Sequence, residues 1–191
     1  MKSLKVIIAE DEPVTRKDIK EMLEEDKIIT IGECGDGATA VNLARSLRPD
    51  LIIMDIKMPI MNGIEAAQML NKEKIAPVML LTAYSQPQLI DEARSAGVLA
   101  YLVKPINKQN LIPACYIAVS RYEEFSILVK EVNSLHEALE SRKVIEKAKG
   151  IIQKHYSLDE EGAFKKIRKM SMNQQKTMKE IAEAIITALG E

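Results

Sequence analysis

The chain has 191 residues, of which 47% are hydrophobic and 29% are charged, and its formal net charge is −1. This length allows one large globular domain or two small ones. The near-zero charge excludes a global field that attracts nucleic acid or membranes, so any such partner must bind a local patch.

Residues 1–105 alternate short apolar runs with amphipathic runs, which predicts strands separated by helices. Five such strands imply parallel crossovers, and their nearly continuous apolar character is typical of a sheet covered on both faces. We therefore expect a doubly wound α/β domain. The expected strands are 5–9, 28–34, 51–54, 77–81 and 100–103, and the expected helices are 13–26, 38–48, 62–73 and 86–97.

One long helix is expected from about residue 107 to about residue 155, with a local kink at Pro113. Part of it carries apolar residues that step by 3 and 4, which is a heptad seam and predicts a coiled coil. A monomer exposes this seam, so we expect it to form a homodimer on activation. The seam residues are Phe125, Leu128, Val132, Leu135 and Leu139.

Beyond Arg142 the apolar face widens, as expected for a bundle of three helices. The segment "SLDE" (157–160) predicts a capping box with Ser157 as N-cap, and "TMKE" (177–180) predicts another at the start of the last helix. The residues expected to face inward before and along the middle helix are Ile145, Ala163, Phe164, Ile167 and Met170.

Polar side chains follow the strands of the predicted sheet at their carboxyl ends, where ligands bind in doubly wound folds. A lone aspartate after a strand is usually a cap or turn residue, but the whole set is hard to obtain by chance. Three carboxylates need positive charge, which a lysine and a hard ion such as Mg²⁺ supply, and the set predicts a phosphoryl-transfer site. Its members are Glu10, Asp11, Asp55, Thr82 and Lys104.

Residues 4–121 resemble a response-regulator receiver domain through "IIAEDE", "LIIMDIKMPIMNGIE", "LLTAY" and "AYLVKP". The resemblance implies a flavodoxin-like sheet of order 2-1-3-4-5 in a domain spanning 1–121. It implies that Asp55 accepts a phosphoryl group from a sensor histidine kinase, with Mg²⁺ held by Glu10, Asp11 and Asp55. It also implies a switch pair, Thr82 and Tyr101, and a cis Lys104–Pro105 bond.

An aspartyl-phosphate hydrolase is the enzymatic alternative. Such enzymes usually carry a second aspartate two residues after the nucleophile, and Lys57 occupies that position here. We therefore expect a protein that is not an enzyme. Because the two cysteines, Cys34 and Cys115, are too few for a disulfide framework, and because no apolar run reaches membrane-span length, we expect a cytoplasmic protein that does not bind membranes.

Residues 142–179 carry eleven basic and four acidic side chains, a difference of +7. A charge run is usually a solvated helix face, but basic residues from three helices favour a phosphate-binding surface. Gly150 interrupts a helix at a cost of about 1 kcal/mol relative to alanine. It indicates either close helix packing or the approach of a nucleic-acid loop to bare backbone.

Residues 138–186 resemble the ANTAR domain, an RNA-binding module of transcription antiterminators, through the spacing of Arg142, "AKG", "AF" and "IRKMSM". The resemblance implies a domain at 142–191 after a coiled-coil linker at 122–141. It implies binding of paired RNA stem-loops in leader transcripts, which prevents a terminator from forming. The arrangement of receiver, coiled coil and ANTAR domain resembles that of ethanolamine-utilisation antiterminators. The residues it implies as RNA contacts are Arg142, Lys149, Arg168, Ser171 and Lys176.

The main alternative is a DNA-binding response regulator. A helix-turn-helix needs a short turn and a recognition helix, whereas the first helix here is too long and continues a coiled coil. A module that binds only protein would leave the +7 surface unexplained. We therefore expect RNA rather than DNA as the partner.

Overall fold

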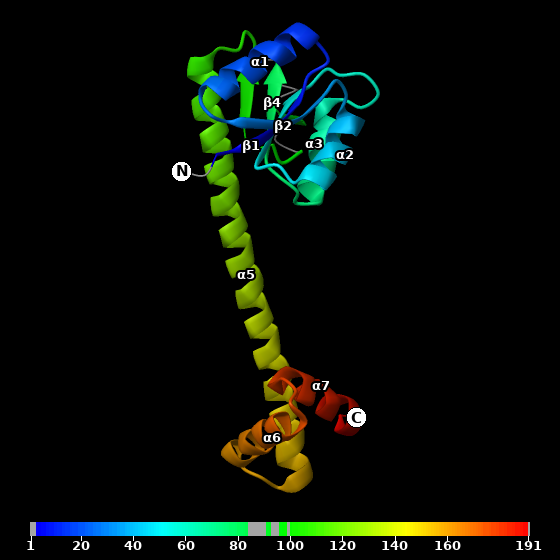
Figure 1. The fold of residues 1–191 in the computed structure, drawn as a ribbon. Helices are drawn as coiled ribbons and strands as arrows, with labels where there is room; N and C mark the ends of the chain where they lie inside the picture. Colours follow the sequence, from blue (N-terminus) through cyan, green and yellow to red (C-terminus); the bar gives the residue numbers. More distant parts are fainter. Residues whose placement is uncertain (1–2, 84–90, 93–95, 99, 191) are drawn as a thin grey trace. The chain divides into compact units, whose positions relative to one another are not determined.

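The computed structural model of the chain describes residues 3–83, 91–92, 96–98 and 100–190. Within these residues a single parallel sheet has the order β2-β1-β3-β4-β5, as predicted (Figure 1). The predicted helix 86–97 lies mostly outside the described residues. The strands are β1 (Lys5–Ala9), β2 (Ile29–Cys34), β3 (Leu51–Asp55), β4 (Val78–Thr82) and β5 (Ala100–Val103).

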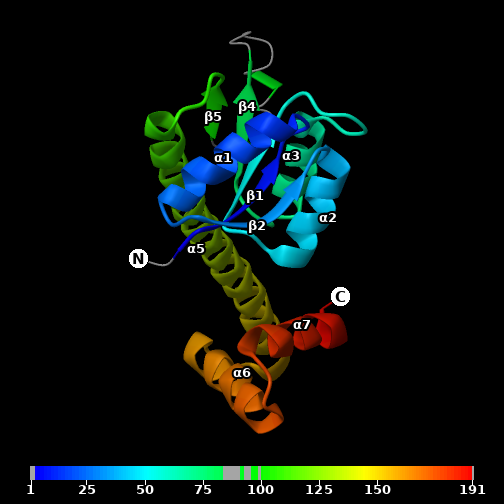
Figure 2. The ribbon, with the colours of Figure 1, turned by 45° about the horizontal axis from the view of Figure 1, so that its top comes forward.

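Helices cover both faces of the sheet. Successive side chains of each strand point to opposite sides, so each strand contributes to both cores. On one face Ile52, Met54 and Leu80 pack among residues of α2 (Gly37–Leu47) and α3 (Gly63–Lys72). On the other face Ile53 and Leu81 pack among residues of α1 (Pro13–Glu25) and of the start of α5 (Lys108–Tyr156). Figure 2 shows α2 and α3 together, with the start of α5 on the opposite side of the sheet. This double cover leaves the ends of the strands as the place for polar groups.

The long helix α5 spans Lys108–Tyr156 and continues through Pro113, as predicted; a kink there stays a prediction. A reciprocal contact closes its first turn: Asn110 N–H donates to Asn107 Oδ1 at 3.0 Å, and Asn107 N–H donates to Asn110 Oδ1 at 3.1 Å. The chain divides into two compact units, residues 1–126 and 127–191, so the boundary falls within α5.

The second unit is a three-helix domain formed by the end of α5, α6 (Glu160–Gln174) and α7 (Met178–Leu189). The predicted capping box at Thr177 is confirmed. Its buried core consists of Ala148, Ile152, Ala163, Ile167, Ile181, Ala182 and Ile185.

Two predictions about α6 are wrong. Its N-cap is Asp159, whose side chain accepts from Gly162 N–H at 2.8 Å, and not Ser157, which has a left-handed φ of 52° in the turn after α5. Phe164, predicted to be core, is 41% exposed because Ala163 and Ile167 occupy the face that meets the other helices.

Candidate functional site

The carboxyl ends of the parallel strands bring the predicted polar residues to one edge of the sheet. Glu10 follows β1, and Lys104 follows β5. The N–H of Lys104 donates to the carbonyl of Thr82 at the end of β4 at 2.8 Å. Asp55 and Thr82 are the last residues of β3 and β4. Glu10 and Asp55 are only 1% and 7% exposed, so two carboxylates are desolvated where the strands end.

Lys104 joins the two buried carboxylates. Its Nζ lies 2.8 Å from Glu10 Oε2 and 3.2 Å from Asp55 Oδ1. Desolvation acts to lower the pKa of this ammonium, but the hydrogen bond to Glu10 and the negative charges raise it overall. The raised pKa favours the charged form of Lys104 beside Asp55, the predicted phosphoacceptor. The Lys104–Pro105 peptide bond is cis, which confirms that prediction.

Burial raises the pKa of both carboxyl groups. For Asp55 desolvation dominates, and the charge and hydrogen bond of Lys104 act against it. For Glu10 desolvation again dominates, and the Asp55 charge adds to it. The single lysine thus does not neutralise this cluster, which retains a demand for positive charge.

A divalent cation fits this demand. Carboxylate oxygens of Glu10, Asp11 and Asp55 lie within 4.8 Å of one another, and Asp11 is exposed whereas the other two are buried. Mg²⁺ prefers hard oxygen ligands and keeps several waters, which an open side of the site allows. The donor set therefore suits Mg²⁺.

Gly63 is a residue of the site that the prediction did not single out. A Cβ at this position would lie 2.1 Å from the carbonyl oxygen of Asp55. Gly63 N–H also donates to the Ile56 carbonyl at 2.9 Å, which ties the start of α3 to the end of β3. Only glycine allows this approach, so Gly63 helps to set the backbone on which Asp55 sits.

The proposed switch residues differ in burial. Thr82 is buried at the end of β4, and Tyr101 is exposed on the edge strand β5. In strand register Tyr101 pairs with Leu80, two residues before Thr82. The tyrosine is therefore outward in this structure, and its inward turn stays a prediction.

The predicted RNA contacts divide into two groups. Arg142, Arg168 and Lys176 are exposed. Lys149 is instead only 7% exposed, and its Nζ lies 2.8 Å from Glu146 Oε2 and 2.7 Å from Glu160 Oε1. This pairing links α5 to the first residue of α6, and two carboxylates are the partners of the Lys149 ammonium in this structure.

Ser171, another predicted RNA contact, is engaged at the end of α6. Its Oγ donates to the Lys176 carbonyl at 2.6 Å, and Lys176 N–H donates to the Ser171 carbonyl at 3.2 Å. These bonds shape the turn that carries the exposed Lys176 side chain. Ser171 is thus placed to position Lys176.

Gly150 lies on α5 with open space around it. A Cβ built there meets no heavy atom within 4 Å among the described residues. Close packing within the described part of the chain therefore does not explain this glycine, and the approach of a nucleic-acid loop stays a prediction.

The predicted seam is a continuous exposed stripe on α5. Its five residues are between 58% and 64% exposed: Phe125, Leu128, Val132, Leu135 and Leu139. Their exposure is what the predicted seam requires of a single chain, and its role as a dimer interface stays a prediction. Over the described part of the chain, no helix combines the length and the apolar character needed to cross a membrane.

Comparisons with known proteins agree with both halves of this description. The response regulator receiver domain matches residues 6–116, and the ANTAR domain matches residues 133–186. Transcriptional regulatory protein PdtaR of Mycobacterium tuberculosis is 48% identical over 186 residues, covering 97% of this chain and 91% of PdtaR.

Solved receiver domains share the fold of the first unit. The receiver domain of Francisella response regulator 1452 is 32% identical with a TM-score of 0.58, covering 62% of this chain and 98% of that chain. The signal receiver domain of NarL from Mycobacterium tuberculosis is 24% identical with a TM-score of 0.61, covering 63% of this chain and 98% of that chain. The chain therefore belongs to the response regulators that join a receiver domain to an ANTAR domain.

Proposed function

We propose that a sensor histidine kinase phosphorylates this protein at Asp55, and that the phosphorylated form dimerises and binds paired RNA stem-loops. The observation that carries the proposal is the placement of the Lys104 ammonium 3.2 Å from Asp55 Oδ1, beside the carboxylates of Glu10 and Asp11. This arrangement combines a nucleophile with groups that stabilise charge on a phosphoryl group.

In the proposed transfer, a carboxylate oxygen of Asp55 attacks the phosphorus atom of a phosphohistidine. A new O–P bond forms, the P–N bond breaks, and its electron pair returns to the imidazole of the kinase. Glu10, Asp11 and Asp55 would hold Mg²⁺, which when bound would supply positive charge to the phosphoryl oxygens. Lys104 supplies a second positive charge from its position between Glu10 and Asp55. Thr82, buried at the end of β4, contacts the phosphoryl group, and Tyr101 then turns inward.

The exposed seam on α5 is the proposed dimer interface. Burying a leucine side chain completely stabilises by about 1.5–3 kcal/mol, so a stripe of five large apolar residues favours association. A dimer presents two ANTAR units together. The second unit then binds its hairpin at a high effective concentration, so paired hairpins bind more tightly than one.

The basic surface of the second unit is the proposed RNA site, with Arg142, Arg168 and Lys176 as direct contacts. Lys149 supports that surface through its ion pair with Glu160, and Ser171 supports it through its hydrogen bond to the Lys176 carbonyl. Binding to hairpins in a leader transcript would prevent a terminator from forming. The protein would then act as a cytoplasmic transcription antiterminator, which suits its likeness to a transcriptional regulatory protein.

The test is binding of the full chain, with and without phosphorylation by acetyl phosphate, to paired RNA hairpins and to duplex DNA of equal length. We expect phosphorylation to tighten RNA binding, and Asp55→Asn to abolish both the phosphoprotein and this gain. Four to six phosphate contacts predict a log–log salt slope of about −3 to −5. Tighter binding to duplex DNA would favour the DNA-binding alternative, and no binding to either would favour a module that binds protein.

A further inference from the structure

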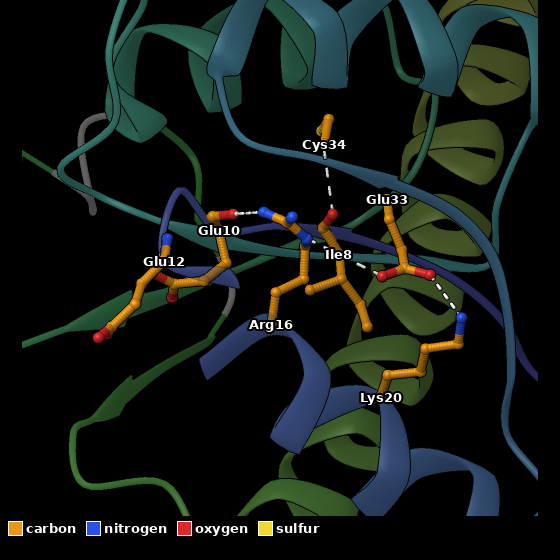
Figure 3. Close-up of polar contacts among 7 residues, drawn as sticks. All are labelled: Ile8, Glu10, Glu12, Arg16, Lys20, Glu33 and Cys34. Carbon is orange, nitrogen blue, oxygen red and sulfur yellow. Dashed lines mark hydrogen bonds and ion pairs between the residues drawn. The ribbon is translucent and has the colours of Figure 1, made fainter. Parts of the chain in front are cut away.

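The backbone that carries two of the metal-binding carboxylates is held by a side chain outside the predicted site. The N–H of Glu10 donates to the Cys34 carbonyl at 3.0 Å, just beyond the last residue of β1. The carbonyl of the same residue accepts from Arg16 Nη1 at 2.5 Å (Figure 3). A guanidinium on α1 therefore holds the chain where it leaves the sheet.

Arg16 is itself oriented by its neighbours. Its Nε lies 3.9 Å from Glu33 Oε2 on β2, and Glu33 Oε1 accepts from Lys20 Nζ at 2.6 Å. Figure 3 shows Glu33 between the two basic side chains, with Arg16 extending toward Glu10. A Cβ at Gly35 would lie 3.8 Å from Arg16 Nη1, so the turn after β2 also passes close to the guanidinium.

We propose that Arg16 is a positioning residue for the Mg²⁺ site, because it fixes the peptide plane between Glu10 and Asp11. This inference rests on the metal site of the proposed function. The carbonyl that Arg16 holds and the N–H of Asp11 belong to one rigid peptide group. Fixing that group sets the direction in which the Asp11 side chain leaves the backbone.

Asp11 needs this support more than the other two ligands. Glu10 is buried, and its carboxylate already binds Lys104 at 2.8 Å and accepts from Glu12 N–H at 3.4 Å. Asp55 is fixed at the end of a central strand, whereas Asp11 is exposed after the end of β1. Groups that orient metal ligands typically contribute 10–100-fold to metal affinity.

The experiment is calorimetric titration of the full-length protein with Mg²⁺. We expect Arg16→Ala to weaken Mg²⁺ binding about tenfold or more. Arg16→Lys keeps the positive charge but lacks the planar guanidinium that contacts Glu10 and Glu33 together, so its Mg²⁺ affinity should remain within threefold of that of Arg16→Ala. Lys20→Ala is the matched control, because Lys20 binds the same Glu33 but does not contact the Glu10 carbonyl; its affinity should stay within twofold of wild type.

Thermal unfolding in EDTA separates positioning from simple destabilisation, and Arg16→Met, which keeps the aliphatic stem, replaces Arg16→Ala if the latter does not fold. Wild-type Mg²⁺ affinity in Arg16→Ala, full rescue by lysine, or an equal loss in Lys20→Ala would each overturn the inference. Asp11→Asn tests the metal site itself. If Asp11→Asn also binds Mg²⁺ normally, the proposed site fails; if it alone loses binding, only the role of Arg16 fails.

Discussion

Replacing Gly150 with alanine separates the stability of the ANTAR domain from its proposed binding function. Glycine inside a helix is less stable than alanine by about 0.5–1 kcal/mol, and the added Cβ has no heavy atom within 4 Å. Gly150→Ala should therefore raise the free energy of unfolding by about 0.5–1 kcal/mol. For a domain of 60–100 residues this corresponds to a rise of about 2–8 °C in Tm.

The same substitution should weaken RNA binding. If a hairpin approaches the bare backbone at Gly150, the new methyl group occupies part of that space, and we expect at least a threefold loss of affinity in a filter-binding assay with paired hairpins. Thr187→Ala on α7 is the control. It also removes a residue that is unfavourable in helices, and its exposed side chain contacts only the Glu183 carbonyl among the contacts described.

A more stable Gly150→Ala variant that binds RNA like wild type would refute the argument that Gly150 serves nucleic-acid approach. A less stable variant would contradict the open space that the stability argument assumes at Gly150. Thr187→Ala should gain a few tenths of a kcal/mol at most and bind RNA normally.

Burial raises the pKa of the Asp55 carboxyl above 3.8 and that of the Glu10 carboxyl above 4.5, so these groups bind protons more tightly in the folded protein than in the unfolded chain. Without metal, the stability of the protein should therefore fall as pH rises through and above these values. Asp55→Asn should accordingly raise the Tm in EDTA at pH 7, and an unchanged or lower Tm would contradict this reasoning. Leu135→Lys should give a folded monomer after phosphorylation when measured by light scattering, whereas Glu137→Lys, an exposed change on the same helix outside the seam, should leave the dimer intact. Arg168→Ala should lower RNA affinity and reduce the salt slope by about 0.7–0.9 while phosphorylation stays normal, and an unaltered slope would remove Arg168 from the contact surface.

The receiver fold could be predicted because its signals are local and repeated. Each buried strand is a short apolar run that ends at a polar residue, and parallel pairing then brings these ends to one edge. Lys104 meets Glu10 across 94 positions of sequence for this reason. Chain order and the direction of the strands are sufficient to predict such a site.

The errors lie where several choices satisfy the same local rule. Ser157 and Asp159 are both good N-cap residues, and only the backbone decides between them: Ser157 has φ 52°, whereas Asp159 is extended and accepts from Gly162 N–H. Phe164 lies at the margin of an apolar helix face, where spacing alone does not define how wide the packed face is.

Contacts between elements were the other gap. The sequence shows that Lys149 is basic, but not that Glu146 and Glu160 meet its ammonium. It likewise shows Arg16 as one of several charged residues on α1, and only the structure shows its guanidinium at the Glu10 carbonyl. Such roles depend on distances between elements that periodicity does not contain.

The position of the seam gives the proposed phosphorylation a route to the proposed RNA binding that leaves the RNA site unaltered. The single helix α5 contributes Leu111 and Cys115 to the receiver core and Ala148 and Ile152 to the ANTAR core, and the seam occupies the helix between these pairs. A receiver that favours dimerisation therefore acts on a segment that belongs to the same helix as the RNA-binding unit. Because the gain in affinity then comes from the second unit, a monomeric Leu135→Lys variant should bind a single hairpin like wild type and lose only the advantage for paired hairpins. Equal loss for single and paired hairpins would instead mean that the seam shapes the RNA site directly.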